Sequence, residues 1–245
     1  MSVESHLPAY RILADDLRAQ ITSGRLRPGD RLPTEPKLCL RSGVSRSTVR
    51  EALRLLASQN LIVTTRGVAG GSFVAHPSPV QLSDTITTGL LLMLASSVVT
   101  VEESLEVREM LEVPAAGLAA RRRTEEHLRI LRGTLFDPQT ATMEAMATAN
   151  PAFHVALAEA SGNQLFAVIS RPLYALTNRS LSEEMDREFW IGLDADHRAI
   201  LDAIEVEDVP AAEAAARRHL DNMRAGVARV APERLKEGVS VAGGA

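Results

Sequence analysis

Residues 43–54 read GVSRSTVREALR, and this stretch decides the fold of the N-terminal part of the chain. Gly43 favours a turn, and Ser45 is the predicted N-cap of the helix that follows. The apolar side chains of this helix recur every three or four residues, as one buried face requires: Val49, Ala52, Leu53 and Leu56. The outward residues near its start are basic or hydroxylated: Arg46, Ser47, Thr48 and Arg50.

Two further helices are predicted upstream of this stretch. The nearer one begins at Glu35, after Thr34 as its N-cap, and ends near Gly43. The first helix ends at Gly24 and carries apolar residues four positions apart: Leu13, Leu17 and Ile21. Two helices joined by a short turn that contains glycine form a helix-turn-helix pattern.

A β-hairpin is predicted downstream. Residues 61–65 and 72–74 are β-like runs, and the six residues between them, RGVAGG, are rich in glycine. A hairpin tip that carries Arg66 and Gly67 suits a wing that contacts the DNA backbone or the minor groove. Three helices followed by this hairpin predict a winged helix-turn-helix over residues 1–76.

Residue chemistry supports DNA binding by this region. Arginine can donate two hydrogen bonds to a guanine edge, and residues near the start of a recognition helix reach furthest into the major groove. Each piece also has an ordinary interpretation, because an exposed arginine is often only solvated and a glycine-rich turn is often only a turn. The order of the elements together with their chemistry favours the DNA-binding interpretation.

The net charge of −4 conceals an asymmetry. Residues 1–75 hold eleven Lys and Arg against six Asp and Glu, whereas the remainder holds sixteen against twenty-five. A basic segment can meet a polyanion that an acidic segment would repel. Chance clustering is the alternative for an imbalance of this size.

Composition restricts the class of protein. Aromatic residues make up 3% of the chain, which favours helices packed through aliphatic side chains. Cys39 is the single cysteine, so no disulfide can form within the chain, and a reducing cytoplasm is expected. The longest apolar run, residues 89–95, is too short to span a bilayer, and no signal peptide is recognised. The sequence therefore predicts a cytoplasmic protein without a membrane partner.

The rest of the chain is predicted to be helical, which makes the fold class mainly α. A linker is expected at residues 77–82, where Pro77 and Pro79 favour extended chain, and a helical domain at residues 83–230. The candidate helices are 80–95, 102–122, 125–135, 139–160, 163–181, 186–206 and 210–229. The tail, residues 231–245, is expected to be disordered.

Three histidines of the helical domain are candidate metal ligands. His154, His197 and His219 fall on three different predicted helices, and Asn150 precedes His154 by one helical turn. Nitrogen and oxygen atoms from separate helices can converge in a bundle and hold a metal ion. A histidine on a helix is more often only hydrogen-bonded or exposed, so spacing alone leaves both interpretations open.

Arg108 is a candidate for binding the carboxylate of an effector. A guanidinium can bind such a group with two parallel hydrogen bonds. The alternative is a structural ion pair with Glu112, which follows one turn later on the same predicted helix. These two interpretations are about equally supported by the sequence.

The N-terminal region resembles the GntR family of winged-helix regulators over about residues 8–76. The matching motifs are PGDRLPTE at 28–35, GVSRSTVREALR at 43–54 and GGSFV at 70–74. The resemblance implies operator contacts from Arg46, Arg50, Thr48 and the wing tip at Arg66 and Gly67. Pro36 stands where the family often has a contacting arginine, so that contact is absent or passes to Lys37. The predicted DNA-binding set is Thr34, Lys37, Ser45, Arg46, Ser47, Thr48, Arg50, Arg66 and Gly67.

The helical region resembles the FCD effector domain of the FadR-like branch over about residues 82–228, which implies that the domain at 83–230 binds the ligand and forms the dimer. The matching motifs are REMLE at 108–112, AAGLAA at 115–120, Phe153-His154, SGN at 161–163 and the two later histidine segments. The resemblance implies a divalent metal, Zn or Ni, held by an aspartate and three histidines, and a carboxylate effector near it. The aspartate position is Asn150 here, which removes one formal charge. The predicted metal ligands are Asn150, His154, His197 and His219, and the predicted effector-binding residues are Arg108 and Asn150.

The predicted function is a homodimeric, ligand-responsive transcription regulator, most often a repressor in this family. Two winged helices would bind a pseudo-palindromic operator, and a small organic acid would change operator affinity. One alternative is a metal-dependent hydrolase at the three histidines, but the sequence has no HExxH, GxSxG or Walker motif, and no enzyme is predicted. The other is a ligand-independent architectural DNA-binding protein, which leaves the acidic helical domain unexplained.

Overall fold

The computed structural model describes residues 7–67, 70–96, 98–181, 185–230 and 232. The chain divides into two compact units, Met1–Ser78 and Pro79–Ala245, and each is described by itself. The tail expected at residues 231–245 lies outside the described residues apart from Pro232.

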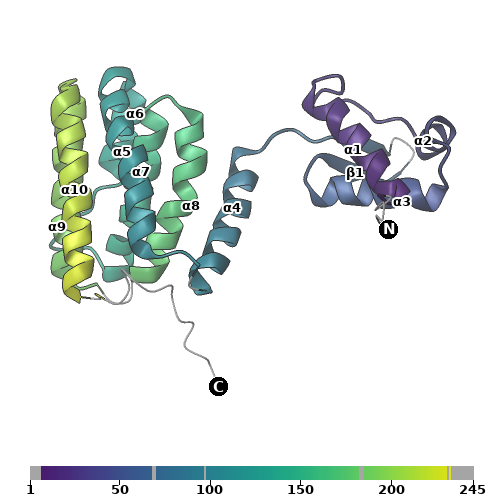
Figure 1. Ribbon diagram of the computed structural model, residues 1–245. Coiled ribbons are helices and arrows are strands. Elements are labelled where there is room, and N and C mark those ends of the chain that lie inside the picture. The colour runs from purple at the N-terminus through teal and green to yellow at the C-terminus, as the bar shows by residue number, and fades with distance from the viewer. Residues whose placement is uncertain (1–6, 68–69, 97, 182–184, 231, 233–245) are drawn as a thin grey trace. The chain divides into compact units, whose positions relative to one another are not determined.

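The first unit is a winged helix-turn-helix, as predicted (Figure 1). Its described residues form three helices, α1 (Ala9–Thr22), α2 (Glu35–Ser42) and α3 (Arg46–Ser58), and a hairpin of β1 (Ile62–Thr65) and β2 (Gly71–Val74). The two strands are antiparallel, with Ile62 opposite Val74 and Thr65 opposite Gly71. Apolar side chains from all three helices and both strands form one core, which includes Leu17, Leu38, Val49, Leu56, Ile62 and Val74.

The turn between α2 and α3 is set by local chemistry. Gly43 ends α2 with a φ of 67°, a left-handed conformation that glycine adopts without steric cost. Ser45 then caps α3, because its hydroxyl accepts the backbone N–H of Thr48 at 3.2 Å. These two residues place the start of α3 after a tight turn, as a helix-turn-helix requires.

A short segment before α2 holds the wing. The N–H of Leu32 donates to the carbonyl of Ser72, and the N–H of Val74 donates to the carbonyl of Asp30, each at 2.9 Å. The guanidinium of Arg31 donates to the carbonyl of Gly70 and lies 5.8 Å from the centre of the Phe73 ring. Residues 30–32 therefore pair with β2 on the side away from β1, an element that the sequence interpretation missed.

All elements of regular secondary structure in the described residues of the second unit are helices. Its helices are α4 (Pro79–Ala95), α5 (Val101–Arg122), α6 (Glu125–Gly133), α7 (Met143–Ala160), α8 (Gln164–Leu181), α9 (Arg187–Glu205) and α10 (Val209–Val230). Helix α4 begins at Pro79, so four residues of the expected linker 77–82 are helical. Proline is tolerated there because a first-turn N–H has no partner within the helix. Helix α7 begins at Met143, later than the predicted 139.

Helix α5 lies at the centre of this unit and contacts α7, α8, α9 and α10, whereas α4 packs on α8 (Figure 1). The main core contains small and aliphatic side chains from α5, α6, α7, α9 and α10, such as Ala116, Leu131, Leu157, Ile204 and Leu220. A second cluster surrounds Trp190 and Leu105. No described helix is both long and apolar enough to cross a membrane.

Candidate functional site

The start of α3 presents the side chains that were predicted to contact DNA. Val49, Ala52 and Leu56 are fully buried, which turns Arg46, Ser47 and Arg50 outward, and all three are exposed. The hydroxyl of Ser45 lies 2.7 Å from that of Ser47 and 2.8 Å from that of Thr48. Helix α3 therefore exposes two guanidinium groups beside a cluster of hydroxyls.

Most of the other predicted DNA-binding residues are also exposed on the first unit, whereas Thr48 is half-buried. Thr34 precedes α2 at the N-cap position, but its side chain makes no capping hydrogen bond. Lys37 is exposed on the first turn of α2, and Arg66 is exposed at the wing, next to Gly67 with a φ of 104°. Glu35 lies 3.5 Å from the Nε atom of Arg50, so an ion pair links α2 to α3. Contact of these residues with DNA stays a prediction.

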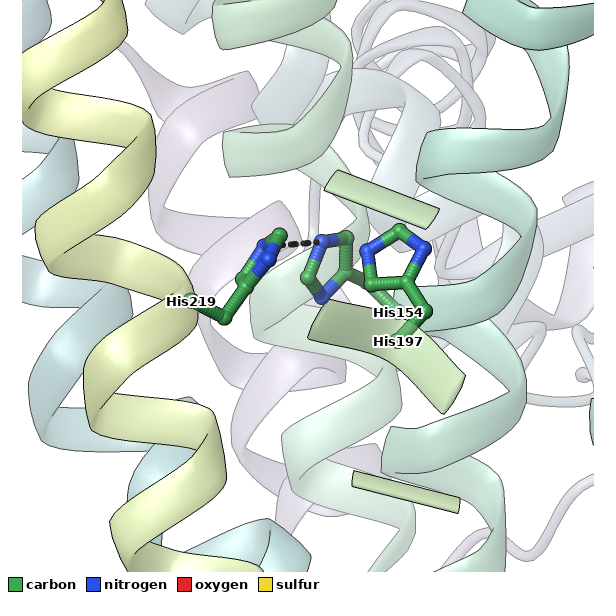
Figure 2. Close-up of side chains that lie close together, drawn as sticks. All are labelled: His154, His197 and His219. Carbon is green, nitrogen blue, oxygen red and sulfur yellow. Dashed lines mark hydrogen bonds between the residues drawn. The ribbon is translucent and has the colours of Figure 1, made fainter. Parts of the chain in front are cut away.

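The three candidate histidines converge inside the second unit. His154 comes from α7, His197 from α9 and His219 from α10, and all three are buried (Figure 2). One nitrogen from each ring can be chosen so that all three lie within 4.8 Å of one another. The Nε2 atoms of His154 and His219 are 3.2 Å apart. The three histidine side chains, whose spacing in the sequence left two interpretations open, therefore do lie together in the fold.

Arg108 and Glu112 of α5 complete the buried polar cluster. Both are buried, and the Nε of Arg108 donates to Oε1 of Glu112 at 2.5 Å, which is the intrahelical ion pair predicted as the structural alternative. The guanidinium also faces the histidines, because its Nη2 lies 3.1 Å from Nε2 of His154. Arg108 therefore forms the ion pair with Glu112, and its guanidinium also lies beside the candidate metal ligands.

Glu112 also contacts a histidine, a link that the sequence did not reveal. Its Oε2 lies 2.8 Å from Nδ1 of His154. Burial alone would raise the pKa of Glu112, but the charge of Arg108 and the contact with His154 hold it well below its ordinary value. The carboxylate is therefore ionised, and it faces the side of the His154 ring opposite Nε2.

Two of the buried histidines, His154 and His197, are neutral at physiological pH. Burial lowers the pKa of His154 to about 4, although the carboxylate of Glu112 acts in the opposite direction. Burial also lowers the pKa of His197 well below its ordinary value, and the charges of nearby His219, His154 and Arg108 lower it further. A metal ion binds the neutral imidazole, so these shifts leave the nitrogen lone pairs available to a ligand.

Aromatic residues around the cluster fix the ring orientations. The Phe153 ring stacks on His197 with centroids 4.1 Å apart and an interplanar angle of 11°. The Tyr174 ring stacks on His154 at 5.0 Å and lies 5.2 Å from the guanidinium carbon of Arg108. Tyr174 also lines a groove of about 690 Å³ between α6, α7 and α8. No sequence signal marks Tyr174 as part of this site.

The donor set fits a divalent transition metal. Nitrogen atoms bound to one ion at 2.0–2.1 Å are about 3–4 Å apart, so only small side-chain movements separate this cluster from that spacing. Two buried acceptors in the set, Oδ1 of Asn150 and Nε2 of His197, have no hydrogen-bond partner. Carboxylates lie beside two rings, because Asp196 is 3.7 Å from Nδ1 of His219 and Glu112 contacts His154. Carboxylates in this outer position commonly orient metal-binding histidines.

Comparisons with known proteins match both parts of the chain. Residues 9–74 match the family described as "Bacterial regulatory proteins, gntR family", and residues 103–222 match the FCD domain. The HTH-type transcriptional regulator LutR of Bacillus subtilis (strain 168) is 32% identical over 213 residues, which cover 83% of this chain and 94% of LutR. The putative L-lactate dehydrogenase operon regulatory protein of Escherichia coli (strain K12) is 31% identical over 218 residues, covering 85% of this chain and 82% of that protein. The solved structure of Streptococcus agalactiae GntR is 25% identical, with a TM-score of 0.56 and coverage of 88% of this chain and 99% of that chain.

Proposed function

The chain belongs to the GntR family of bacterial regulatory proteins, and from this we propose that it represses transcription in the cytoplasm as a homodimer that releases its operator in response to a small carboxylate. It is a transcription regulator with a GntR winged helix and an FCD domain, and not an enzyme. This membership excludes the alternative of a hydrolase built on the three histidines.

The exposed start of α3 carries the DNA-binding part of the proposal. Arg46 and Arg50 are exposed and lie one turn apart at the start of the helix, where a recognition helix reads base edges in the major groove. Thr34, Lys37, Ser45, Ser47 and Thr48 are proposed to bind the flanking phosphates or bases, and Arg66 with Gly67 the backbone or minor groove next to the wing.

Replacing Arg46 or Arg50 by alanine is expected to weaken operator binding by about 1–3 kcal/mol, because each would remove a contact to a base edge or phosphate. A fluorescence anisotropy titration with operator DNA at fixed salt measures the change. Arg54→Ala is the matched control, since Arg54 is exposed further along the same helix and pairs with Glu51. Equal affinities of the Arg46 and Arg50 variants and the parent chain would contradict the assignment of α3 as the recognition helix.

A divalent metal ion, Zn or Ni, is proposed at the histidine cluster. His154, His197 and His219 would supply nitrogen ligands, and Asn150 would add its side-chain carbonyl oxygen. The support is the burial of all three rings and the unpaired acceptors of Asn150 and His197. A bound ion would act there as a Lewis acid that attracts a carboxylate oxygen.

The proposed effector is a small organic acid that binds beside Arg108 and Asn150. The guanidinium of Arg108 is fully desolvated and lies at the histidines, so a carboxylate that reached it would gain a charge-assisted hydrogen bond in a low-dielectric site. One of the relatives is named for the L-lactate dehydrogenase operon, which makes 2-hydroxy acids the first class to test. A tenfold to hundredfold effect on operator affinity needs a coupling of only about 1.4–2.7 kcal/mol.

A thermal-shift screen of small carboxylates, with and without divalent metal, tests the sensing role. The effector is expected to raise the melting temperature, because it binds the folded state alone. The rise is expected only when metal is present, because the proposed ion attracts the carboxylate of the effector. The same compound is expected to lower operator affinity in the anisotropy titration. A panel of 2-hydroxy acids, dicarboxylates and sugar acids that changes neither quantity would favour a ligand-independent DNA-binding protein.

A further inference from the structure

The buried polar cluster is closed off from solvent. Each of its five members exposes 3% or less of its surface: Arg108, Glu112, His154, His197 and His219. A small carboxylate therefore has to pass a layer of side chains before it reaches the guanidinium. At least one of these covering side chains must move when an effector binds.

Tyr174 of α8 lies between this cluster and an open groove. Its ring stacks on His154 with centroids 5.0 Å apart, and the ring centre lies 5.2 Å from the guanidinium carbon of Arg108. The same residue lines the groove of about 690 Å³ between α6, α7 and α8. The Tyr174 side chain, which is 3% exposed, thus covers both an arginine and a histidine of the proposed effector site.

The backbone of α8 is anchored on both sides of this tyrosine. Pro172 has no N–H, so the carbonyl of Val168 loses its partner within the helix, and the hydroxyl of Ser83 in α4 donates to it at 3.0 Å. Further along α8, the hydroxyl of Thr177 lies 3.5 Å from that of Ser104 in α5. Because two other helices hold α8 here, we expect the side chain to rotate while the helix stays in place.

The groove offers both space and a polar partner for the rotated ring. The hydroxyl of Tyr174 is hydrogen-bonded to Ser170, one turn earlier on α8. Asn178 lines the groove one turn later, and its buried Oδ1 atom has no hydrogen-bond partner among the described residues. A buried acceptor that lacks a donor costs free energy, and the rotated hydroxyl would supply that donor. The hydroxyl therefore has a partner in either position.

The groove also carries a positive charge that can meet an acid first. Arg171 lines it three residues before Tyr174, and the guanidinium lies 3.6 Å from the carboxylate of Glu159. The side chains of this ion pair are 42% and 50% exposed. Exposed pairs of this kind contribute little stability, so an incoming carboxylate can replace Glu159 at small cost.

We propose that Tyr174 closes the effector site, and that a small carboxylate enters from the groove when the ring rotates outward. The proposal rests on the proposed function, because it describes how an effector reaches Arg108. Rotation uncovers Arg108 and His154 together, since one ring covers both. The entering end of the effector must fit the space that the phenol ring leaves, which favours slender acids over branched or bicyclic ones.

Chemical modification of histidine in the metal-free full chain tests the closure. Diethyl pyrocarbonate attacks neutral imidazoles that it can reach, and mass spectrometry of peptides locates the products, with the exposed His76 as internal reference. Tyr174→Ala is expected to raise the rate at the cluster histidines by about tenfold or more, because a buried group reacts only when an opening exposes it. Tyr174→Phe keeps the ring and is expected to react as slowly as the parent chain.

Two further variants separate closure from a general loss of stability. Leu131→Ala empties a buried site in the main core that does not line the groove, so it is expected to leave the rate near that of the parent chain. Val155→Phe adds a ring within the groove and is expected to lower the rate, because it fills the space into which Tyr174 rotates. Equal rates in Tyr174→Ala and Leu131→Ala, or a Val155→Phe chain that reacts as fast as the parent, would overturn the closure.

Nickel uptake measured by stopped flow gives a second readout. Tyr174→Ala is expected to speed both uptake and release of Ni²⁺ and to leave the dissociation constant unchanged, because the side chain covers the site without being a ligand. A residue that merely supports the fold would change the dissociation constant instead. A weaker affinity at an unchanged uptake rate would therefore refute the role of Tyr174 in access.

The outcomes distinguish this proposal from the proposed function. The modification experiment needs neither metal, effector nor operator, so it decides the closure even if the chain binds no nickel. Faster modification of Tyr174→Ala, in a chain whose operator affinity no carboxylate changes, would support the closure and count against the sensing role. Unchanged modification, in a chain that does respond to a carboxylate, would overturn only the route through Tyr174.

Discussion

Replacing His197 by alanine is expected to abolish stoichiometric binding of Zn or Ni. His197 supplies one of only three imidazole nitrogens, and its Nε2 is buried without a hydrogen-bond partner. After its loss, two imidazoles and a neutral amide oxygen remain, which is a weak set for a transition metal. Elemental analysis of the purified chain, followed by calorimetric titration of chelator-treated protein, measures the change.

His127→Ala is the matched control for this loss, because His127 belongs to the same unit but caps the start of α6 with its Nδ1 atom. It is expected to keep the metal content of the parent chain. Asn150→Asp should act in the opposite direction and tighten metal binding, because it returns a negative charge to the ligand set. Stoichiometric metal in His197→Ala would refute the three-histidine site, and unchanged affinity in Asn150→Asp would exclude Asn150 as a ligand.

Replacing Glu112 by glutamine is expected to lower the free energy of unfolding by about 3–5 kcal/mol in metal-free protein. The substitution keeps the side-chain shape but leaves the guanidinium of Arg108, which is 1% exposed, without its counter-charge. It also removes the carboxylate beside Nδ1 of His154. Urea denaturation followed by circular dichroism, with a chelator present, measures the difference.

The control for Glu112 is Glu109→Gln on the same helix. Glu109 pairs with Arg217 near the surface, where the Arg217 side chain is 56% exposed, so its loss is expected to cost less than about 1 kcal/mol. A Glu112→Gln variant as stable as Glu109→Gln would show that the buried pair contributes little. A double-mutant cycle with Arg108→Gln separates the pair energy from the effect on His154.

The fold could be predicted from the sequence wherever local pattern decides it. The buried stripe of α3, the turn at Gly43 and the glycine-rich wing tip all reflect interactions between residues close in the chain. The pairing of residues 30–32 with β2 was missed, because its two sides are about forty residues apart and neither carries a strand pattern of its own. Helix α4 extends into the expected linker, because Pro79 occupies a first turn where proline costs nothing.

The candidate site was predictable only in part. Spacing placed His154, His197 and His219 on separate helices, but their convergence depends on how α7, α9 and α10 pack, which no local pattern encodes. The ion pair between Arg108 and Glu112 was predicted as one alternative from their spacing of four residues on one helix, and the structure contains it. The contacts of His154 with Glu112 and Tyr174 join residues from three helices and had no signal in the sequence.

Two backbone hydrogen bonds, from Val74 to the carbonyl of Asp30 and from Leu32 to the carbonyl of Ser72, join the wing to the segment that leads into α2. Because this segment, α2, α3 and both strands share one core, we expect the wing to move together with the helix that carries Arg46 and Arg50. We therefore expect ligand binding to change the position of the whole winged helix-turn-helix, and not the angle between its wing and α3. The same winged helix-turn-helix, fused to an unrelated ligand-binding domain, is therefore expected to keep its preference for operator sequence.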